Sequence, residues 1–158
     1  MVVKLFGAAL VIFGTLFAVT HFFERIELAL KNTSALRSLL ECTKNMIECY
    51  AMPAGEILSG LDGSLLKNCG YCFDVAPASF FELIENCNIY DGEAKDLMLA
   101  FAKDFGKGYR KDELSRCSMF LERMRSREQK LSKETEKKKR VIVAISICGA
   151  LAVVILLI

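Results

Sequence analysis

Two apolar tracts without charged residues, one near each end of the chain, constrain the fold more than any other feature. Leu5–Phe23 and Val141–Ile158 contain no Asp, Glu, Lys or Arg, although the 158-residue chain carries 21 basic and 19 acidic side chains. A helix rises ~1.5 Å per residue, so tracts of this length cover ~27 Å, close to the ~30 Å hydrocarbon core of a bilayer. We therefore predict a transmembrane helix for each tract. Composition argues against a simple soluble globular protein, because exposed apolar surface of this extent causes aggregation.

The first tract could instead be a signal peptide, which would need small residues at alternate positions before a cleavage site. The nearest candidate, Ala18-Val19-Thr20, is a poor one, and the bulky His21-Phe22-Phe23 follows it. An uncleaved anchor is the better interpretation. Residues 1–4 are then a short N-terminal tail, and residues 24–140 form the domain between the two spans.

Basic residues beside the tracts predict the orientation. The run Lys137, Lys138, Lys139 and Arg140 directly precedes the second tract, whereas only Lys4 precedes the first. Basic residues concentrate on the cytoplasmic side of a membrane, so we expect residues 24–140 in the cytoplasm of a two-pass protein. The basic run either serves only this purpose or also contacts anionic lipid headgroups.

The domain between the tracts has the periodicity of α-helices. Apolar or small residues recur at alternating spacings of three and four, which predicts one long helix from the first tract to about Ala51: Ile26, Ala29, Thr33, Leu36, Leu40, Thr43, Ile47 and Tyr50. A second stripe follows Gly108 and predicts a helix to the end of the chain: Leu114, Cys117, Leu121, Met124 and Leu131. No run alternates long enough to predict a strand. The fold class is therefore all-α.

Prolines, glycines and capping residues divide the middle into shorter helices. We expect them at Pro53–Leu61, at Ser64–Phe73, from Pro77 through Ile84, and from Gly92 to Phe105 with Asp91 as the N-cap. In the last of these, the predicted buried side is Leu97, Leu99, Ala100, Phe101 and Phe105. Together with the two long helices, they predict an antiparallel bundle of about six helices, flanked by the N- and C-terminal transmembrane helices.

Charge is unevenly distributed along the domain. Residues 41–104 hold 11 acidic and 4 basic side chains, net −7, whereas residues 105–140 hold 13 basic and 6 acidic ones, net +7. An acidic lobe attracts a basic protein partner and repels the phosphates of nucleic acid. The predicted partner-contact residues are Glu82, Glu85, Asp91, Glu93 and Asp96. The alternative is that these are ordinary solvated helix faces.

Catalytic and metal-binding patterns are weak. The chain has seven cysteines, but Cys69-Gly70-Tyr71-Cys72 is a single CxxC pair, and structural zinc usually takes two such pairs. The only histidine, His21, lies in the first tract, so a Ser/His/Asp set is excluded. No glycine-rich loop is followed by the Lys-Ser or Lys-Thr of a phosphate-binding motif. We expect no enzyme, no metal and no cofactor, and we interpret Cys69, Cys72 and Cys87 as small buried thiols in place of zinc ligands.

The order and spacing of several short motifs resemble a known family. They are Val3-Lys4-Leu5-Phe6-Gly7-Ala8 at the first tract, Tyr50-Ala51-Met52-Pro53, Phe105-Gly106-Lys107, Phe120-Leu121-Glu122-Arg123, and the basic run with the terminal Val154-Ile155-Leu156-Leu157-Ile158. Together they resemble stage III sporulation protein AB of endospore-forming bacteria, over nearly the whole chain.

This resemblance implies a function. The domain would be similar to the helical cytoplasmic domain of the platform protein of type II secretion and type IV pilus systems. The protein would lie in the mother-cell membrane around the forespore, within a secretion-like channel complex. Its partners would be a cytoplasmic secretion-type ATPase and other channel subunits. Association with further copies of the same chain is a separate alternative. The alternatives are a regulatory or sensory membrane protein that uses its thiols and, more remotely, a small-molecule membrane enzyme.

Overall fold

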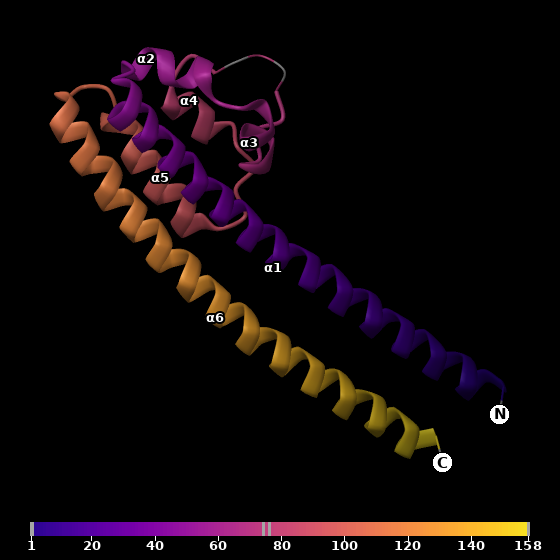
Figure 1. Ribbon diagram of the computed structural model, residues 1–158. Coiled ribbons are helices and arrows are strands. Elements are labelled where there is room, and N and C mark those ends of the chain that lie inside the picture. Colours follow the sequence, from indigo (N-terminus) through magenta and orange to yellow (C-terminus); the bar gives the residue numbers. More distant parts are fainter. Residues whose placement is uncertain (1, 74, 76, 158) are drawn as a thin grey trace. The chain divides into compact units, whose positions relative to one another are not determined.

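The computed structural model describes residues 2–73, 75 and 77–157, which fold into α-helices without a strand (Figure 1). The elements in chain order are α1 (Val2–Tyr50), α2 (Ala54–Ile57), the 3-10 helix η1 (Leu58–Gly60), α3 (Gly63–Asn68), α4 (Phe80–Glu85), α5 (Gly92–Asp104) and α6 (Arg110–Leu157). The all-α prediction with about six helices is confirmed for this part of the chain.

The helix ends follow from local chemistry. At the end of α1, Ala51 adopts a left-handed φ of 50°, and Pro53 then occupies the N-cap of α2 with an extended ψ of 150°. Ser79 caps α4 by accepting a hydrogen bond from the Glu82 N–H at 3.1 Å. The predicted Ser64–Phe73 helix is too long, since α3 ends at Asn68 and Gly70, with φ 93°, turns the chain.

No helix among the residues that the structure describes has both the length and the hydropathy needed to cross a bilayer. The predicted spans, Leu5–Phe23 and Val141–Ile158, both include side chains that lie outside the described set. They are helical where described, as parts of α1 and α6, and the spans remain a prediction from the sequence.

The chain divides into two compact units. Unit 1 consists of the described residues of Met1–Glu27 and Leu131–Ile158, and unit 2 is Leu28–Lys130. Within unit 1, the Lys139 ammonium lies over the Phe23 ring, 5.9 Å from its centre. Unit 2 contains all the short helices and the hydrophobic core.

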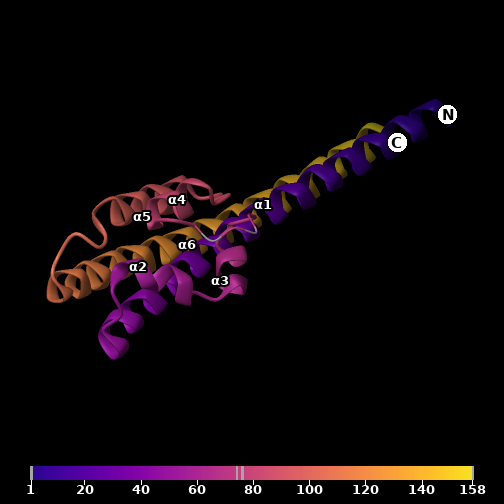
Figure 2. The same ribbon diagram turned by 90° about the horizontal axis from the view of Figure 1, so that it is seen from above.

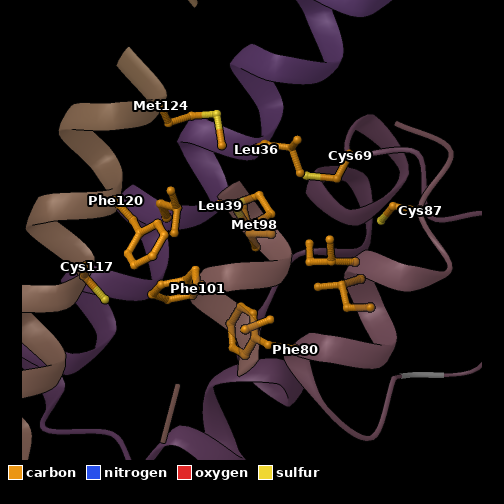
Figure 3. Packing of buried hydrophobic residues seen from close by; sticks show 14 of the residues in the cluster. Leu36, Leu39, Cys69, Phe80, Cys87, Met98, Phe101, Cys117, Phe120 and Met124 are labelled. Atoms are coloured by element: carbon orange, nitrogen blue, oxygen red, sulfur yellow. The ribbon is translucent and has the colours of Figure 1, made fainter. Parts of the chain in front are cut away.

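Four phenylalanines contact one another in unit 2, three of them in the hydrophobic core and the half-buried Phe105 packed against it. Phe101 of α5 lies between Phe80 of α4 and Phe120 of α6, with ring centres 5.9 and 5.6 Å away (Figure 3). Phe105 stacks against the same cluster, 4.6 Å from Phe80. Edge-to-face pairs of this kind contribute ~0.5–1.5 kcal/mol each beyond the area that they bury. In Figures 1 and 2, α4 lies beside α5, and α5 lies beside the part of α6 that belongs to unit 2.

The predicted stripes are correct in α1 and α6 with few exceptions. Leu36, Leu40 and Thr43 are fully buried, but Tyr50 is 76% exposed because α1 ends there. In α5 the predicted buried side is partly wrong: Leu97 and Leu99 are only half-buried and Ala100 is exposed. The fully or nearly fully buried residues of α5 are instead Ala94, Met98, Phe101 and Ala102, because this helix packs against both α4 and α6.

Arginines of α6 connect it to the other helices of unit 2. Arg110 donates from Nε to the Ile47 carbonyl at 3.1 Å and from Nη2 to the Glu48 carbonyl at 2.7 Å, which satisfies the end of α1. Arg116 donates to the Asp104 carbonyl at the end of α5. Arg125 pairs with Glu41 of α1 at 2.8 Å. These contacts join α6 to α1 and to the end of α5. A planar guanidinium suits such contacts because it can donate to two acceptors at once.

Candidate functional site

The five predicted contact residues all lie in unit 2, but they do not form one uniform acidic surface. The Glu82 carboxylate accepts a hydrogen bond from the Ala78 N–H at 2.9 Å, which fixes the start of α4. Glu85, Glu93 and Asp96 are exposed. Asp91 is only 6% exposed. Three of the five carboxylates therefore belong to exposed residues, and one of these, Glu93, is engaged in an ion pair with Arg127.

Asp91 is held in an ion pair with Arg127. Arg127 donates from Nε and Nη2 to the two Asp91 oxygens at 2.8 and 2.7 Å, and from Nη1 it pairs with Glu93 at 2.8 Å. Asp91 occupies the N-cap position of α5 as predicted, but its side chain makes no capping hydrogen bond, because both oxygens face Arg127. Its carboxylate therefore joins α5 to α6 and offers little surface to a partner.

Two of the exposed acids border a groove, which we call the α5–α6 groove. Its volume is about 340 Å³, and its lining is Glu93, Asp96, Leu97, Ala100, Phe120 and Arg123. The Arg123 guanidinium lies over the Phe120 ring, 5.7 Å from its centre. The groove thus has an apolar floor, two carboxylates from α5 and one guanidinium from α6.

A second cavity was not predicted from the sequence. This Glu113 pocket has a volume of about 270 Å³ and is lined by Ile47, Ala51, Met52, Pro53, Phe105, Gly106, Gly108, Arg110 and Glu113. Glu113 is 5% exposed. Its Oε1 accepts hydrogen bonds from the Gly108 N–H at 2.9 Å and from Arg116 at 3.5 Å. Its Oε2 is buried and has no hydrogen-bond partner among the described residues.

The basic run lies in unit 1. Lys137, Lys138 and Arg140 are exposed, and Lys139 is half-buried with its ammonium over the Phe23 ring. The exposed charges are available to bind anionic groups.

The cysteines are free thiols. Burial, together with the neighbouring Cys87, raises the pKa of Cys69 to about 12. Burial likewise raises the pKa of Cys87 and of Cys117 to about 11, so all three remain protonated and unreactive near neutral pH. Cys49, Cys72 and Cys148 are exposed. No group of three potential metal ligands occurs within the described residues.

No local feature of the sequence indicates Arg127 or Glu113 as structural or binding residues. Arg127 meets an acid that lies 36 positions earlier in the chain. Glu113 stands in the first turn of α6, where an acidic residue is commonly just a favourable partner of the helix dipole. Only the tertiary fold places these two side chains in buried surroundings.

Comparison with known proteins gives a single clear result. Neither the curated proteins nor the solved structures include a significant match to the chain. The family model described as stage III sporulation protein AB, in contrast, matches residues 4–158. Since this match covers both apolar tracts and the whole of unit 2, the chain belongs to the stage III sporulation protein AB family.

Proposed function

We propose that this protein is a non-catalytic membrane platform in a sporulation-specific, secretion-like channel complex between mother cell and forespore. Unit 2 binds a basic cytoplasmic protein, for which the secretion-type ATPase implied by the family resemblance is our candidate. The observation that carries the proposal is the family match over residues 4–158, combined with the exposed acids at the α5–α6 groove.

Membrane attachment in this proposal rests on the sequence. The tracts Leu5–Phe23 and Val141–Ile158 are long enough and free of charge, and the four basic residues before the second tract favour a cytoplasmic position for residues 24–140. The attached protein is then two-pass, in the mother-cell membrane. The exposed members of the basic run, Lys137, Lys138 and Arg140, lie directly before the second tract, where lipid headgroups are within reach.

The docking surface is the acidic side of the α5–α6 groove. The net charge of −7 over residues 41–104 attracts a basic partner from a distance, and attraction of this kind mainly raises the rate of association. Leu97, Ala100 and Phe120 supply apolar surface next to Glu93 and Asp96. Apolar centres bordered by charge are the usual anatomy of a protein interface. Asp91 contributes indirectly, by fixing the start of α5 through Arg127.

A thiol-based regulatory function is the alternative. Cys69, Cys87 and Cys117 are buried with raised pKa values, which makes them poor nucleophiles. A mechanism based on thiols would have to use exposed cysteines such as Cys49 and Cys72. Neither belongs to a group of three potential metal ligands among the described residues, so we favour the platform.

The test is capture of the secretion-type ATPase by the full chain in mild detergent. Reversing the exposed acids with Glu85→Lys, Glu93→Lys and Asp96→Lys should reduce capture at least about tenfold, because like charges then face the basic partner. The matched control reverses three other exposed acids, Glu56, Glu122 and Glu134, and should leave capture intact. Equal loss of capture in both triple variants would disprove the proposed docking site. Absence of capture by the unaltered chain would disprove the ATPase as partner.

A further inference from the structure

We propose that the Glu113 pocket receives one arginine side chain of the basic partner protein, an assignment that rests on the docking function proposed above. The pocket is separate from the α5–α6 groove, since none of the nine residues that line it lines the groove. An arginine bound in this pocket fixes the partner at one position, whereas the acidic surface of unit 2 attracts the partner only through its overall charge.

The argument begins with the carboxylate. Glu113 is 5% exposed, and its buried Oε2 has no donor among the described residues. An ionised carboxylate accepts up to about four hydrogen bonds, and a buried charge that lacks donors is unfavourable. Since no described residue supplies these donors, water or a bound group is left to supply them.

The neighbouring arginines do not fill this role. Arg110 lines the pocket, but its Nε and Nη2 donate to the Ile47 and Glu48 carbonyls, where the negative end of the α1 dipole offsets its charge. Arg116 donates to the Asp104 carbonyl and reaches only Oε1 of Glu113, at 3.5 Å. Glu113 is the one carboxylate that lines this pocket, and its ion pair with Arg116 is long, at 3.5 Å, and engages Oε1 alone.

The size and walls of the pocket fit a single long side chain. Its volume of about 270 Å³ falls just below the ~300–1,000 Å³ that is usual for small-molecule sites. Ile47, Met52, Pro53 and Phe105 provide apolar walls for an aliphatic stem, and Glu113, whose Oε2 is buried, completes the lining with a carboxylate. Arginine combines such a stem with a planar group of five donors, which suits a carboxylate better than the single ammonium of lysine.

Two exposed tyrosines adjoin the pocket in the sequence. Tyr50 is 76% exposed and precedes Ala51, whereas Tyr109 is 86% exposed and precedes Arg110. Aromatic side chains left this open to solvent are frequent at protein interfaces, and a guanidinium stacks favourably on an aromatic ring. This end of unit 2 therefore has the composition of an interface around one anchoring pocket.

The test uses n-butylguanidinium as a probe of the arginine side chain, added to the full chain in detergent micelles. The readout is the NMR shift of the Ile47 methyl group in the pocket wall. We expect a saturable shift with n-butylguanidinium and none with n-butylurea, which has a similar shape but no charge. Glu113→Gln should weaken binding of the probe at least about tenfold, because the charged acceptor is lost.

Two further variants keep the result interpretable. Asp112→Asn removes the same charge from the adjacent exposed residue and should bind the probe like the unaltered chain. Met52→Phe places a larger side chain in the pocket wall and should abolish the shift while Glu113 is intact. If Glu113→Gln does not fold, Met52→Phe and the urea comparison decide the question.

Equal shifts with the urea, full binding by Glu113→Gln, or no saturable shift in the unaltered chain would each overturn the assignment. Failure of the probe with ATPase capture retained would disprove the pocket and leave the docking function standing. Binding of the probe without capture would instead show that the pocket is correct and the partner wrongly chosen.

Discussion

Asp91 and Glu113 are equally buried carboxylates at the starts of two helices of unit 2, and they differ in how completely they are bonded. Asp91, at 6% exposure, receives two hydrogen bonds from Arg127, one to each oxygen. Glu113, at 5% exposure, uses only one of its oxygens. Burial alone therefore does not reveal the role of an acidic residue. The fully bonded carboxylate of Asp91 stabilises the fold, whereas the partly bonded one of Glu113, beside a cavity, is the one that we propose as a binding group.

The largest effect is expected from breaking the complete pair. Arg127→Met leaves the buried Asp91 charge without its partner and should lower the free energy of unfolding by ~3–5 kcal/mol. Denaturant unfolding of the full chain in micelles, followed by circular dichroism, measures the loss. Arg125→Met is the matched control, because Arg125 is 57% exposed where it pairs with Glu41, and should cost no more than ~1 kcal/mol. Similar losses in the two variants would contradict a structural role for the Asp91–Arg127 pair.

Neutralising each carboxylate separately sharpens the comparison. Asp91→Asn should cost ~1.5–3 kcal/mol, since two hydrogen bonds between charged groups are lost. Glu113→Gln should cost only ~1 kcal/mol, because its amide oxygen can still accept the Gly108 N–H, and the loss is confined to the long Arg116 contact and to an amide N–H without an acceptor. The same unfolding measurement applies. If the two substitutions lowered the free energy of unfolding equally, Oε2 of Glu113 would have a donor in solution. The difference in bonding between Asp91 and Glu113 would then be disproved.

Glu41 is a half-buried carboxylate, and changes to it should have the smallest effect on stability. Its hydrogen bond from Arg125, and then its attraction to Arg37, outweigh the opposing effect of burial and hold the pKa of this carboxyl below its usual 4.5. A lowered pKa in the folded state stabilises the fold above about pH 4.5, and this stability is lost as the pH falls through the lowered value. The stability difference between the unaltered chain and Glu41→Gln should therefore shrink as the pH falls from about 7 to about 3.

Arg125→Gln should weaken this pH dependence, because it removes the first cause of the shift. A difference between the unaltered chain and Glu41→Gln that stays constant over the same pH range would show that the ion pair of Glu41 contributes nothing measurable.

The long helices were predictable because their stripes extend over many turns. In α1, spacings of three and four placed Leu36, Leu40 and Thr43 correctly in the core. The same logic failed in α5, where Ala100 is exposed and Met98 fully buried. A helix that contacts neighbours on more than one side buries residues outside a single stripe, and the identity of those neighbours is not written in the local sequence.

The short helices and the site were less predictable for a related reason. α3 ends at Asn68 because Gly70 turns the chain against Asn88: the Asn88 N–H donates to the Gly70 carbonyl at 2.9 Å, and a Cβ on Gly70 would lie 2.6 Å from the Asn88 oxygen. Gly70 and Asn88, which are in contact, lie 18 positions apart in the sequence. The Asp91–Arg127 pair and the Glu113 pocket likewise depend on distant segments. Sequence correctly indicated an acidic region, but only the fold separates its structural acids from its exposed ones.

The arginines of α6 have a consequence for how this helix tolerates change. Arg110 and Arg127 each contact two groups on other parts of unit 2, and Arg116 contacts the Asp104 carbonyl and Glu113 of its own helix. A lysine would keep the charge but lose the flat, forked geometry that reaches two groups at once. In the primary structure these residues and Lys137–Arg140 look like one cationic segment. Arg110, Arg116 and Arg127 hold the fold together and should tolerate few substitutions. Lys137–Arg140 require only positive charge, so lysine and arginine should be interchangeable there.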